Sequence, residues 1–264
     1  MSNKDDFGQG KLDKFETFEK IIERLRGPEG CPWDRKQTHD SLKQYLVEEC
    51  YEVLETIEEN DMPALCEELG DLWLQIMLHA EIAREYNEFT LGDVLRKINT
   101  KLIYRHPHVF GGKKVQDADE VALKWEELKE QEKPENNSLL AGVPKNLPAL
   151  AYSQSIQGRA ASVGFDWPDV DDIVDKLGEE IEELRQADGH EEKAREFGDI
   201  LFTLANIARR LDIELESALR QTNARFSRRF GYIEETCKKR GIDLKSLPLA
   251  EMDELWEEAK TALE

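Results

Sequence analysis

The sequence predicts an all-α protein made of two tandem, homologous helical-bundle domains. Apolar residues recur at spacings of three and four along both halves of the chain, which is the period of one helix face. No run of alternating β-branched residues between hairpin turns interrupts this pattern. The two halves also carry the same landmarks in the same order, which indicates a duplication.

The predicted helices follow one another as apolar stripes. The first half has stripes that consist of Phe15, Phe18, Ile21, Ile22 and Leu25, then Leu46, Val53, Leu54 and Ile57, then Leu65, Leu69, Leu72 and Ile76. Residues 60–63 contain the Asn, Asp and Pro expected in the turn of a helical hairpin. The second half has stripes that consist of Ile173, Val174, Leu177, Ile181 and Leu184, then Ile200, Leu201, Leu204, Ile207 and Ala208.

Residues 131–148 separate the two halves, because they are rich in Pro, Asn and Gly and have no sustained period. We therefore predict an N-terminal domain at 1–132, a linker at 133–148 and a C-terminal domain at 149–264. The shared landmarks pair at offsets that drift only from 132 to 124, and they are Asp34 with Asp166, Glu49 with Glu180, Glu68 with Glu196, Asp71 with Asp199, and Lys101 with Arg225.

The charge balance is strongly acidic, since 36 basic and 57 acidic side chains give a net charge of −21. We therefore expect no electrostatic binding to nucleic acid or to an anionic membrane, and an anionic substrate would need a divalent cation or a local Lys/Arg cluster. The four cysteines form no Cys-x-x-Cys pair, and the most apolar run, at 72–83, is short and interrupted by polar residues. We expect a cytoplasmic protein that is neither secreted nor embedded in a membrane.

Carboxylates gather at helical spacing in both halves. In the first half, Glu48, Glu49 and Glu52 span about 100° of a helix, and Glu68 and Asp71 are three apart on the next predicted helix. An antiparallel hairpin would bring these two acidic edges together, and such a cluster suits Mg²⁺, which prefers oxygen ligands and shares its shell with substrate phosphates. The second half repeats the arrangement with Glu179, Glu180, Glu183, Glu196 and Asp199.

A single E-E-x-x-E match has little weight in so acidic a chain, where about one is expected by chance. A third match, at Glu126, Glu127 and Glu130, has no E-x-G-D downstream and indicates a solvated helix face. The paired motif, present twice, is specific. The glycine inside each E-x-G-D, Gly70 and Gly198, predicts a close approach of the two acidic helices.

Basic pairs follow each acidic pair at matching places in the repeat. Lys101 and Arg105 are four apart, as are Arg225 and Arg229, so each pair shares one helix face. Such faces can bind phosphate oxygens, with salt bridges to surface glutamates as the alternative. Trp256 has two interpretations, one as a base-stacking residue and one as a core residue.

Both domains resemble MazG domains. The matching segments are GCPWDRKQTHDSL, EECYEV, EELGDLWLQ and RHPHVF in the first half, and VGFDW, EEIEEL, EFGDILFTLAN, NARFSRRF and LWEEAK in the second. The resemblance implies an all-α, dimeric, Mg²⁺-dependent nucleoside triphosphate pyrophosphohydrolase, with Mn²⁺ as an alternative ion. Such enzymes release a nucleoside monophosphate and pyrophosphate, and their C-terminal domain is mainly credited with hydrolysis.

The resemblance also implies roles for individual residues. The metal ligands would be Glu180, Glu183, Glu196 and Asp199 in the C-terminal domain, and Glu49, Glu52, Glu68 and Asp71 in the N-terminal domain. The nucleotide would contact Lys176, Arg225, Arg229 and Trp256, although Arg225 stands where the family often has lysine. Glu179 or Glu48 is the candidate general base.

Two classes of alternative function remain open. One is a related enzyme on the same fold, such as a dUTP- or dCTP-specific pyrophosphatase or a phosphoribosyl-ATP pyrophosphohydrolase. The other is a helical scaffold that binds metal and nucleotide without turnover. The expected physiological role is nucleotide-pool housekeeping with broad base specificity.

Overall fold

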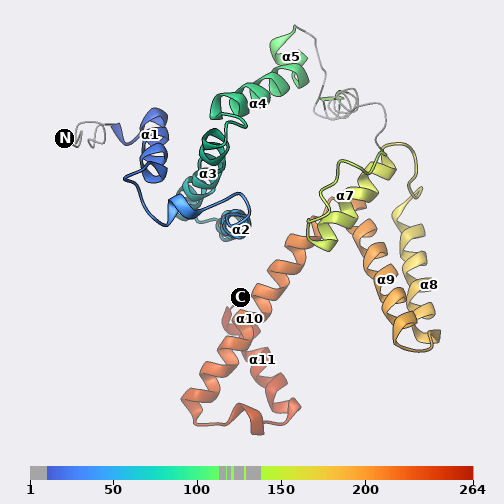
Figure 1. The fold of residues 1–264 in the computed structure, drawn as a ribbon. Coiled ribbons are helices and arrows are strands. Elements are labelled where there is room, and N and C mark those ends of the chain that lie inside the picture. The colour runs from blue at the N-terminus through green and yellow to red at the C-terminus, as the bar shows by residue number, and fades with distance from the viewer. Residues whose placement is uncertain (1–10, 113–116, 118–119, 122–127, 129–137, 264) are drawn as a thin grey trace. The chain divides into compact units, whose positions relative to one another are not determined.

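The structure is a computed structural model that describes residues 11–112, 117, 120–121, 128 and 138–263, and it confirms the all-α prediction (Figure 1). The described residues form helices, turns and loops and contain no strand. The chain divides into two compact units, Met1–Lys133 and Pro134–Glu264. The third acidic motif, at 126, 127 and 130, and the first part of the predicted linker, 133–137, lie outside the described residues.

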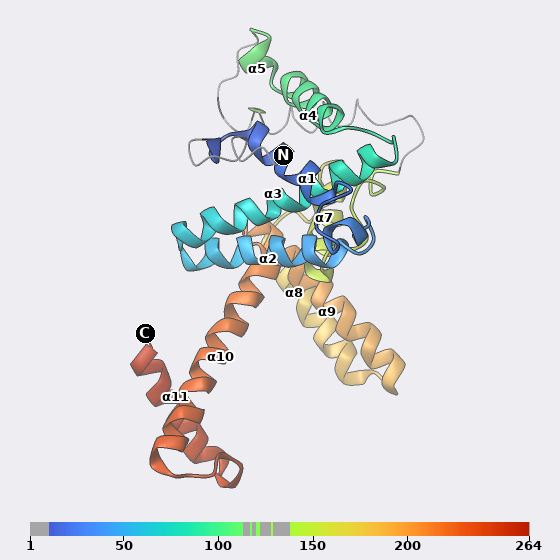
Figure 2. The same cartoon turned by 60° about the vertical axis from the view of Figure 1, so that its left-hand side comes forward.

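Unit 1 begins with helix α1, Phe15–Arg26, and the short 3-10 helix η3, Asp34–Lys36. A helical hairpin follows, made of α2, Lys43–Glu59, and α3, Met62–Glu85, which lie side by side (Figure 2). Helices α4, Leu91–Arg105, and α5, Pro107–Phe110, follow this hairpin.

The turn between α2 and α3 has the predicted chemistry. Asn60 ends α2 in the left-handed conformation, at φ 57°, which asparagine tolerates better than most residues. Asp61 then accepts a hydrogen bond from the Ala64 N–H and caps α3, and Pro63 occupies the first turn. These residues reverse the chain, so that the acidic segments of α2 and α3 face each other.

The core of unit 1 lies where α1 and the start of α2 meet the C-terminal half of α3. Its fully buried side chains are Ile22, Leu42, Met77, Leu78 and Ile82. Arg26, which is 8% exposed, joins this core to the preceding loops, because its guanidinium donates to both carboxylate oxygens of Glu85 at 2.8 Å and to the Gln37 carbonyl at 3.3 Å.

Unit 2 contains α7, Ala149–Ala161, and a second hairpin made of α8, Val170–Gln186, and α9, His190–Arg210 (Figure 1). Asp169 caps α8 by accepting from the Asp172 N–H, and Gly189 enters α9 at φ 85°. The chain continues through α10, Leu215–Arg240, the 3-10 helix η4, Leu244–Ser246, and α11, Leu249–Leu263.

Asp166 anchors the loop that precedes α8. Its carboxylate pairs with the guanidinium groups of Arg209 and Arg210 at the end of α9, and Arg210 also donates to the Trp167 carbonyl at 2.6 Å. This loop is the counterpart of the one that Arg26 holds in unit 1, so the two repeats fix the same loop with arginines from different helices.

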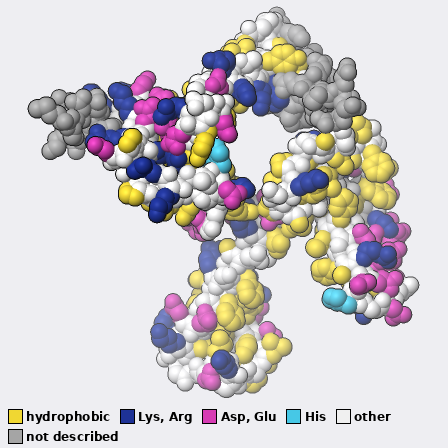
Figure 3. Space-filling view, viewed as in Figure 1, with side chains coloured by type: hydrophobic (Ala, Val, Ile, Leu, Met, Phe, Trp, Pro, Cys, Tyr) yellow, Lys and Arg dark blue, Asp and Glu magenta, His cyan; other side chains and the backbone are white. Residues whose placement is uncertain are grey.

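Part of the predicted apolar stripes stays exposed within the chain. On α2 and α3, Ile57, Leu69 and Ile76 are all about half exposed, as are Val174 and Leu201 on α8 and α9. Hydrophobic side chains lie among charged ones on the face of the molecule that Figure 3 shows. The period correctly predicts the helices, but these side chains do not enter the core of their own unit. Contiguous exposed apolar residues on monomers are typical of interaction surfaces.

None of the described helices is long and apolar enough to cross a bilayer. All four cysteines carry free thiols, and Cys237 is buried in the small core between α10 and α11.

Candidate active site

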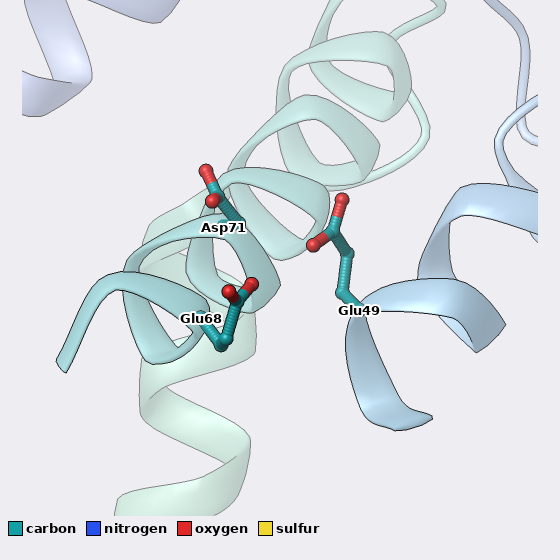
Figure 4. Close-up of side chains that lie close together, drawn as sticks. All are labelled: Glu49, Glu68 and Asp71. Atoms are coloured by element: carbon teal, nitrogen blue, oxygen red, sulfur yellow. The ribbon is translucent and has the colours of Figure 1, made fainter. Parts of the chain in front are cut away.

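The α2–α3 hairpin brings three predicted carboxylates together in unit 1. Glu49 on α2 faces Glu68 and Asp71 on α3 (Figure 4), and each offers an oxygen within 4.8 Å of the others. The one-turn spacing of Glu68 and Asp71 puts both on the same face of α3. The predicted convergence of two acidic helix edges therefore occurs in the structure.

Like charges dominate the electrostatics of this unit 1 cluster. Burial and then the nearby carboxylates of Asp71 and Glu52 raise the pKa of Glu49 above its ordinary value. Burial, Glu52 and Asp71 likewise raise the pKa of Glu68. Glu52 thus lies close enough to the cluster to repel it, although it is outside the group of three converging oxygens.

The α8–α9 hairpin of unit 2 forms the corresponding cluster. Glu180 and Glu183 on α8 and Glu196 on α9 place oxygens within 4.8 Å of one another. Glu180 and Glu196 are only 7% and 6% exposed, whereas Glu183 is exposed. Asp199 lies one turn after Glu196 on α9 and is exposed, outside the converging three.

Two cations offset the negative charge of the unit 2 cluster. The Lys176 ammonium lies 3.0 Å from Glu180 Oε1 and 3.1 Å from Glu179 Oε2, and hydrogen bonds to these carboxylates raise the pKa of Lys176. The Arg195 guanidinium lies 2.7 Å from Glu196 Oε1, and this bond raises the pKa of Arg195. The buried carboxylates of unit 2 are therefore paired.

Unit 1 has no counterpart to these cations at the equivalent positions. The offset of 131 between Glu49 and Glu180 maps Lys176 onto Tyr45, and the offset of 128 between Glu68 and Glu196 maps Arg195 onto Glu67. The corresponding pairs Glu49/Glu68 and Glu180/Glu196 therefore have different electrostatic surroundings.

Comparison with known proteins identifies the family. A family model described as the MazG nucleotide pyrophosphohydrolase domain matches residues 37–110, and one described as phosphoribosyl-ATP pyrophosphohydrolase matches residues 159–226. The chain is 48% identical over 248 residues to a Thermotoga maritima protein named nucleoside triphosphate pyrophosphohydrolase/pyrophosphatase MazG, covering 93% of this chain and 95% of that protein. The chain belongs to the MazG family.

Two further relatives match a similar span of the chain. An Escherichia coli K12 protein named nucleoside triphosphate pyrophosphohydrolase is 40% identical over 257 residues, which cover 94% of this chain and 98% of that protein. The Bacillus subtilis protein YabN is 52% identical over 252 residues, which cover 94% of this chain and 52% of the longer YabN.

The predicted general bases of the MazG-like site lie beside the clusters. The Glu179 side chain is 65% exposed and bonded to Lys176, and Glu48 accepts a hydrogen bond from Gln44 at 2.8 Å. Two other neighbours were not predicted from the sequence. Arg195 pairs with Glu196, and the buried Gln75 donates to Glu49 Oε1 at 3.3 Å.

The predicted nucleotide-contact residues of unit 2 lie on α8, α10 and α11. On α10 and α11, Arg229 lies over the Trp256 ring, 5.6 Å from its centroid, and the Phe226 ring lies 5.3 Å from it. Trp256 also packs against the α10–α11 core, as its second interpretation predicted. Arg225 is exposed and donates to Thr222 Oγ1 at 3.0 Å.

The predicted phosphate-contact residues of unit 1 are on α4. Lys101 is exposed and Arg105 ends the helix. Helix α4 meets α3 at its own start, where Leu91 packs against the unit 1 core, ten residues before Lys101.

The prediction for the two motif glycines is wrong. A Cβ added to Gly70 or Gly198 would meet no atom within 4 Å, so neither glycine is required for the approach of the acidic helices within the chain. The hairpin turns and the apolar contacts between the helices suffice to bring the carboxylates together.

The donor sets fit a hard divalent cation. Each cluster offers three carboxylate oxygens, with a further carboxylate adjacent, Glu52 in unit 1 and Asp199 in unit 2. Oxygen-only donors suit Mg²⁺ or Mn²⁺, and the absence of His or Cys from both groups disfavours zinc. The repulsion among Glu49, Glu68 and Asp71 would be relieved by a cation.

Proposed function

We propose that this chain is a Mg²⁺-dependent nucleoside triphosphate pyrophosphohydrolase. Water would cleave the anhydride bond between the α and β phosphorus atoms and release a nucleoside monophosphate and pyrophosphate. The observation that carries the proposal is the convergence of Glu180, Glu183 and Glu196 beside Lys176 and Arg195. The names of the Thermotoga maritima and Escherichia coli relatives, which match along nearly their whole length, support the same activity.

The unit 2 residues would have separate roles in metal binding and phosphate binding. Glu180, Glu183, Glu196 and Asp199 would hold Mg²⁺, which when bound supplies charge neutralisation for the phosphates and orients the attacking water. Lys176 and Arg195 would bind phosphate oxygens. Their charged groups lie within 3.1 Å of carboxylate oxygens of Glu179, Glu180 or Glu196, so both cations stand beside the proposed metal site.

Glu179 would accept the proton of the attacking water. Its side chain is 65% exposed and adjoins Glu180 in sequence, yet it is outside the group of converging oxygens. A carboxylate beside the metal but not needed to hold it can act as a general base.

We extend the proposal to a homodimer that works in the cytoplasm on a broad set of nucleoside triphosphates. The half-exposed apolar stripe on α2, α3, α8 and α9 supports the dimer, because self-association would bury it. The net charge of −21 supports a small anionic substrate bound through metal rather than a nucleic acid.

A second candidate substrate is phosphoribosyl-ATP. The match of residues 159–226 to the phosphoribosyl-ATP pyrophosphohydrolase model favours it, because that segment carries all the unit 2 carboxylates. Phosphoribosyl-ATP contains the same α–β anhydride bond, so the same site chemistry would apply.

Product analysis tests the proposal. The protein is incubated with Mg²⁺ and, in separate reactions, with each common ribo- and deoxynucleoside triphosphate and with phosphoribosyl-ATP, and the products are resolved by phosphorus NMR. Monophosphate and pyrophosphate support the proposal. Orthophosphate with a diphosphate, or no turnover of any substrate, would contradict it.

A further inference from the structure

A cavity of about 370 Å³ opens in unit 2 between α7, α9 and the loop before α8. Aromatic rings and a few polar side chains share its wall, among them Gln157, Phe165, Trp167, Phe202, Asn206 and Arg209. Mostly apolar cavities of this size with a few convergent polar groups are typical small-molecule sites.

The cavity is separate from the residues proposed for the reaction. Of the described side chains that line it, none belongs to the carboxylate clusters, and Lys176, Arg195 and Trp256 are also absent from the lining. The charged side chains among them are Asp166 and Arg209, which pair with each other. Because these two charges cancel, and an unpaired charge is costly to bury, the cavity favours a neutral ligand over a phosphate ester.

Two buried polar atoms at this cavity have no hydrogen-bond partner in the described part of the chain. Gln157 is 7% exposed and its Nε2 donates to the Phe202 carbonyl at 2.8 Å, but its Oε1 accepts no hydrogen bond. The buried Nε of Arg209 donates to no acceptor, although the Nη2 of the same guanidinium bonds Asn206 and Asp166. Buried polar atoms without partners are destabilising, so one free acceptor and one free donor point to a ligand that carries a donor beside an acceptor.

Aromatic rings at the cavity are open to solvent. Phe165 is 81% exposed, and Trp167 and Phe202 are 41% and 43% exposed. Exposed rings beside a cavity provide stacking surfaces for another ring.

The corresponding positions of unit 1 are filled by leucines. The offset of 128 along the second hairpin helix maps Phe202 onto Leu74 and Asn206 onto Leu78. Leu78 is 2% exposed in the unit 1 core, and Leu74 packs against the same core. The positions that line a cavity in unit 2 therefore belong to the packed core in unit 1.

We infer that the cavity is a second ligand site, which binds a small neutral aromatic carboxamide and takes no part in holding the nucleotide. The amide N–H would donate to Gln157 Oε1, the amide carbonyl would accept from Arg209 Nε–H, and the aromatic ring would stack on the exposed rings. A carboxylate offers acceptors only and would set its charge against Gln157 Oε1, and a hydrocarbon satisfies neither atom. This inference goes beyond the proposed function and does not depend on it.

Three probes of similar size test the chemical class. Benzamide, benzoate and toluene are titrated into the isotope-labelled full-length protein without Mg²⁺ or nucleotide, and the NMR signals of the Trp167 indole and Arg209 Nε are followed. We expect saturable shifts with benzamide and at least about tenfold weaker binding of benzoate and toluene, which lack one or both hydrogen bonds. Equal affinity for the three probes, or no shift with benzamide, would overturn the inference.

Gln157→Leu separates hydrogen bonding from cavity shape. It removes the free acceptor and keeps an apolar side chain, so benzamide binding should weaken about tenfold while toluene binding stays unchanged. Gln154→Leu is the matched control, because Gln154 lies one turn earlier on α7 and both ends of its amide are satisfied by the backbone of Ile213 and Leu215. It should leave the binding of both probes unchanged. Equal weakening of benzamide and toluene in Gln157→Leu would contradict recognition of an amide.

Competition with a nucleotide tests whether the site is separate. The α,β-methylene analogue of ATP keeps the nucleoside and the three phosphates but lacks the bond that the proposed reaction cleaves. In the presence of Mg²⁺ and this analogue, the Kd of benzamide should remain the same. Displacement of benzamide by the analogue would assign the cavity to the nucleotide and overturn the inference. Benzamide binding by a protein that hydrolyses no nucleotide would refute the proposed function alone, and hydrolysis without benzamide binding would refute the second site alone.

Discussion

The Lys176 ammonium lies 3.0 Å from Glu180 Oε1, one turn away on α8, whereas the equivalent of Lys176 in unit 1 is Tyr45. Together with Arg195 on Glu196, this pair gives each of the two buried unit 2 carboxylates a cationic partner. The unit 1 carboxylates can avoid mutual repulsion only by taking up protons or a cation. The two repeats thus keep corresponding glutamates and differ in the charges that surround them.

Lys176→Met should separate metal binding from nucleotide binding in unit 2. Loss of the ammonium removes a competitor for Glu180, so Mg²⁺ affinity without nucleotide should rise, and loss of a phosphate contact should raise KM about tenfold. Calorimetric titration of Mg²⁺ and steady-state kinetics measure the two effects. Arg185→Met is the control, because Arg185 pairs with Glu182 on the exposed face of the same helix. An unchanged KM in Lys176→Met would exclude a nucleotide contact.

The pH dependence of stability should report the repulsion in unit 1. Since the folded-state pKa values of Glu49 and Glu68 are raised, the native state binds more protons than the unfolded state just above the ordinary pKa of 4.5. The metal-free protein should therefore lose stability from these groups as pH rises from 4.5 through their folded pKa values. Thermal unfolding without Mg²⁺ should show a higher Tm for Glu49→Gln than for wild type at pH 7 and a smaller difference at pH 4.5. An equal difference in Tm between Glu49→Gln and wild type at pH 7 and at pH 4.5 would contradict the repulsion among these carboxylates.

The ion pair between Asp166 and two arginines should be a stability determinant of unit 2. Burial alone would raise the pKa of Asp166, but hydrogen bonds from Arg209, the Trp167 N–H and Arg210 prevail and lower it. Asp166→Asn should cost about 2 kcal/mol of unfolding free energy at pH 7, and the cost should vanish as pH falls below the lowered pKa. Urea unfolding measures it, with the exposed Glu182→Gln as the control. A cost independent of pH would show that charge is not involved.

Self-association should depend on the exposed stripe of the hairpin helices. Leu201 on α9 is 41% exposed, so a charge there is tolerated in a monomer but not in an apolar interface. Sedimentation velocity should detect a dimer for wild type and a shift toward monomer for Leu201→Glu. Unchanged sedimentation in Leu201→Glu would place the interface elsewhere, and Lys193→Glu at an exposed polar position of the same helix controls for added charge.

Much of this architecture could be predicted from the sequence because it follows from local periodicity. The period of three and four predicted the helices, and Asn60, Asp61 and Pro63 predicted the turn that aligns Glu49 with Glu68 and Asp71. Spacing also predicted that Glu180 and Glu183 share one face of α8, the face that meets Glu196 on α9.

The remaining features depend on tertiary packing that spacing does not encode. Arg195 is one basic residue among many glutamates, and only the folded hairpin shows that it pairs with Glu196. In the sequence, Gln157 and Asn206 look like ordinary polar helix residues. Only the folded structure shows that both line a cavity between α7 and α9. The prediction of close helix packing at Gly198 is wrong, because no atom of another element lies within 4 Å of a Cβ built there.

The most direct test of the account compares Glu180→Gln with Glu49→Gln in Mg²⁺-dependent release of pyrophosphate from nucleoside triphosphates. Because Glu180 belongs to the carboxylates beside Lys176, we predict that Glu180→Gln lowers kcat/KM at least about 100-fold. Glu49→Gln should keep most of the activity, since unit 1 has Tyr45 and Glu67 where unit 2 has Lys176 and Arg195. Full activity in Glu180→Gln would contradict the assignment of the reaction to the α8–α9 carboxylates.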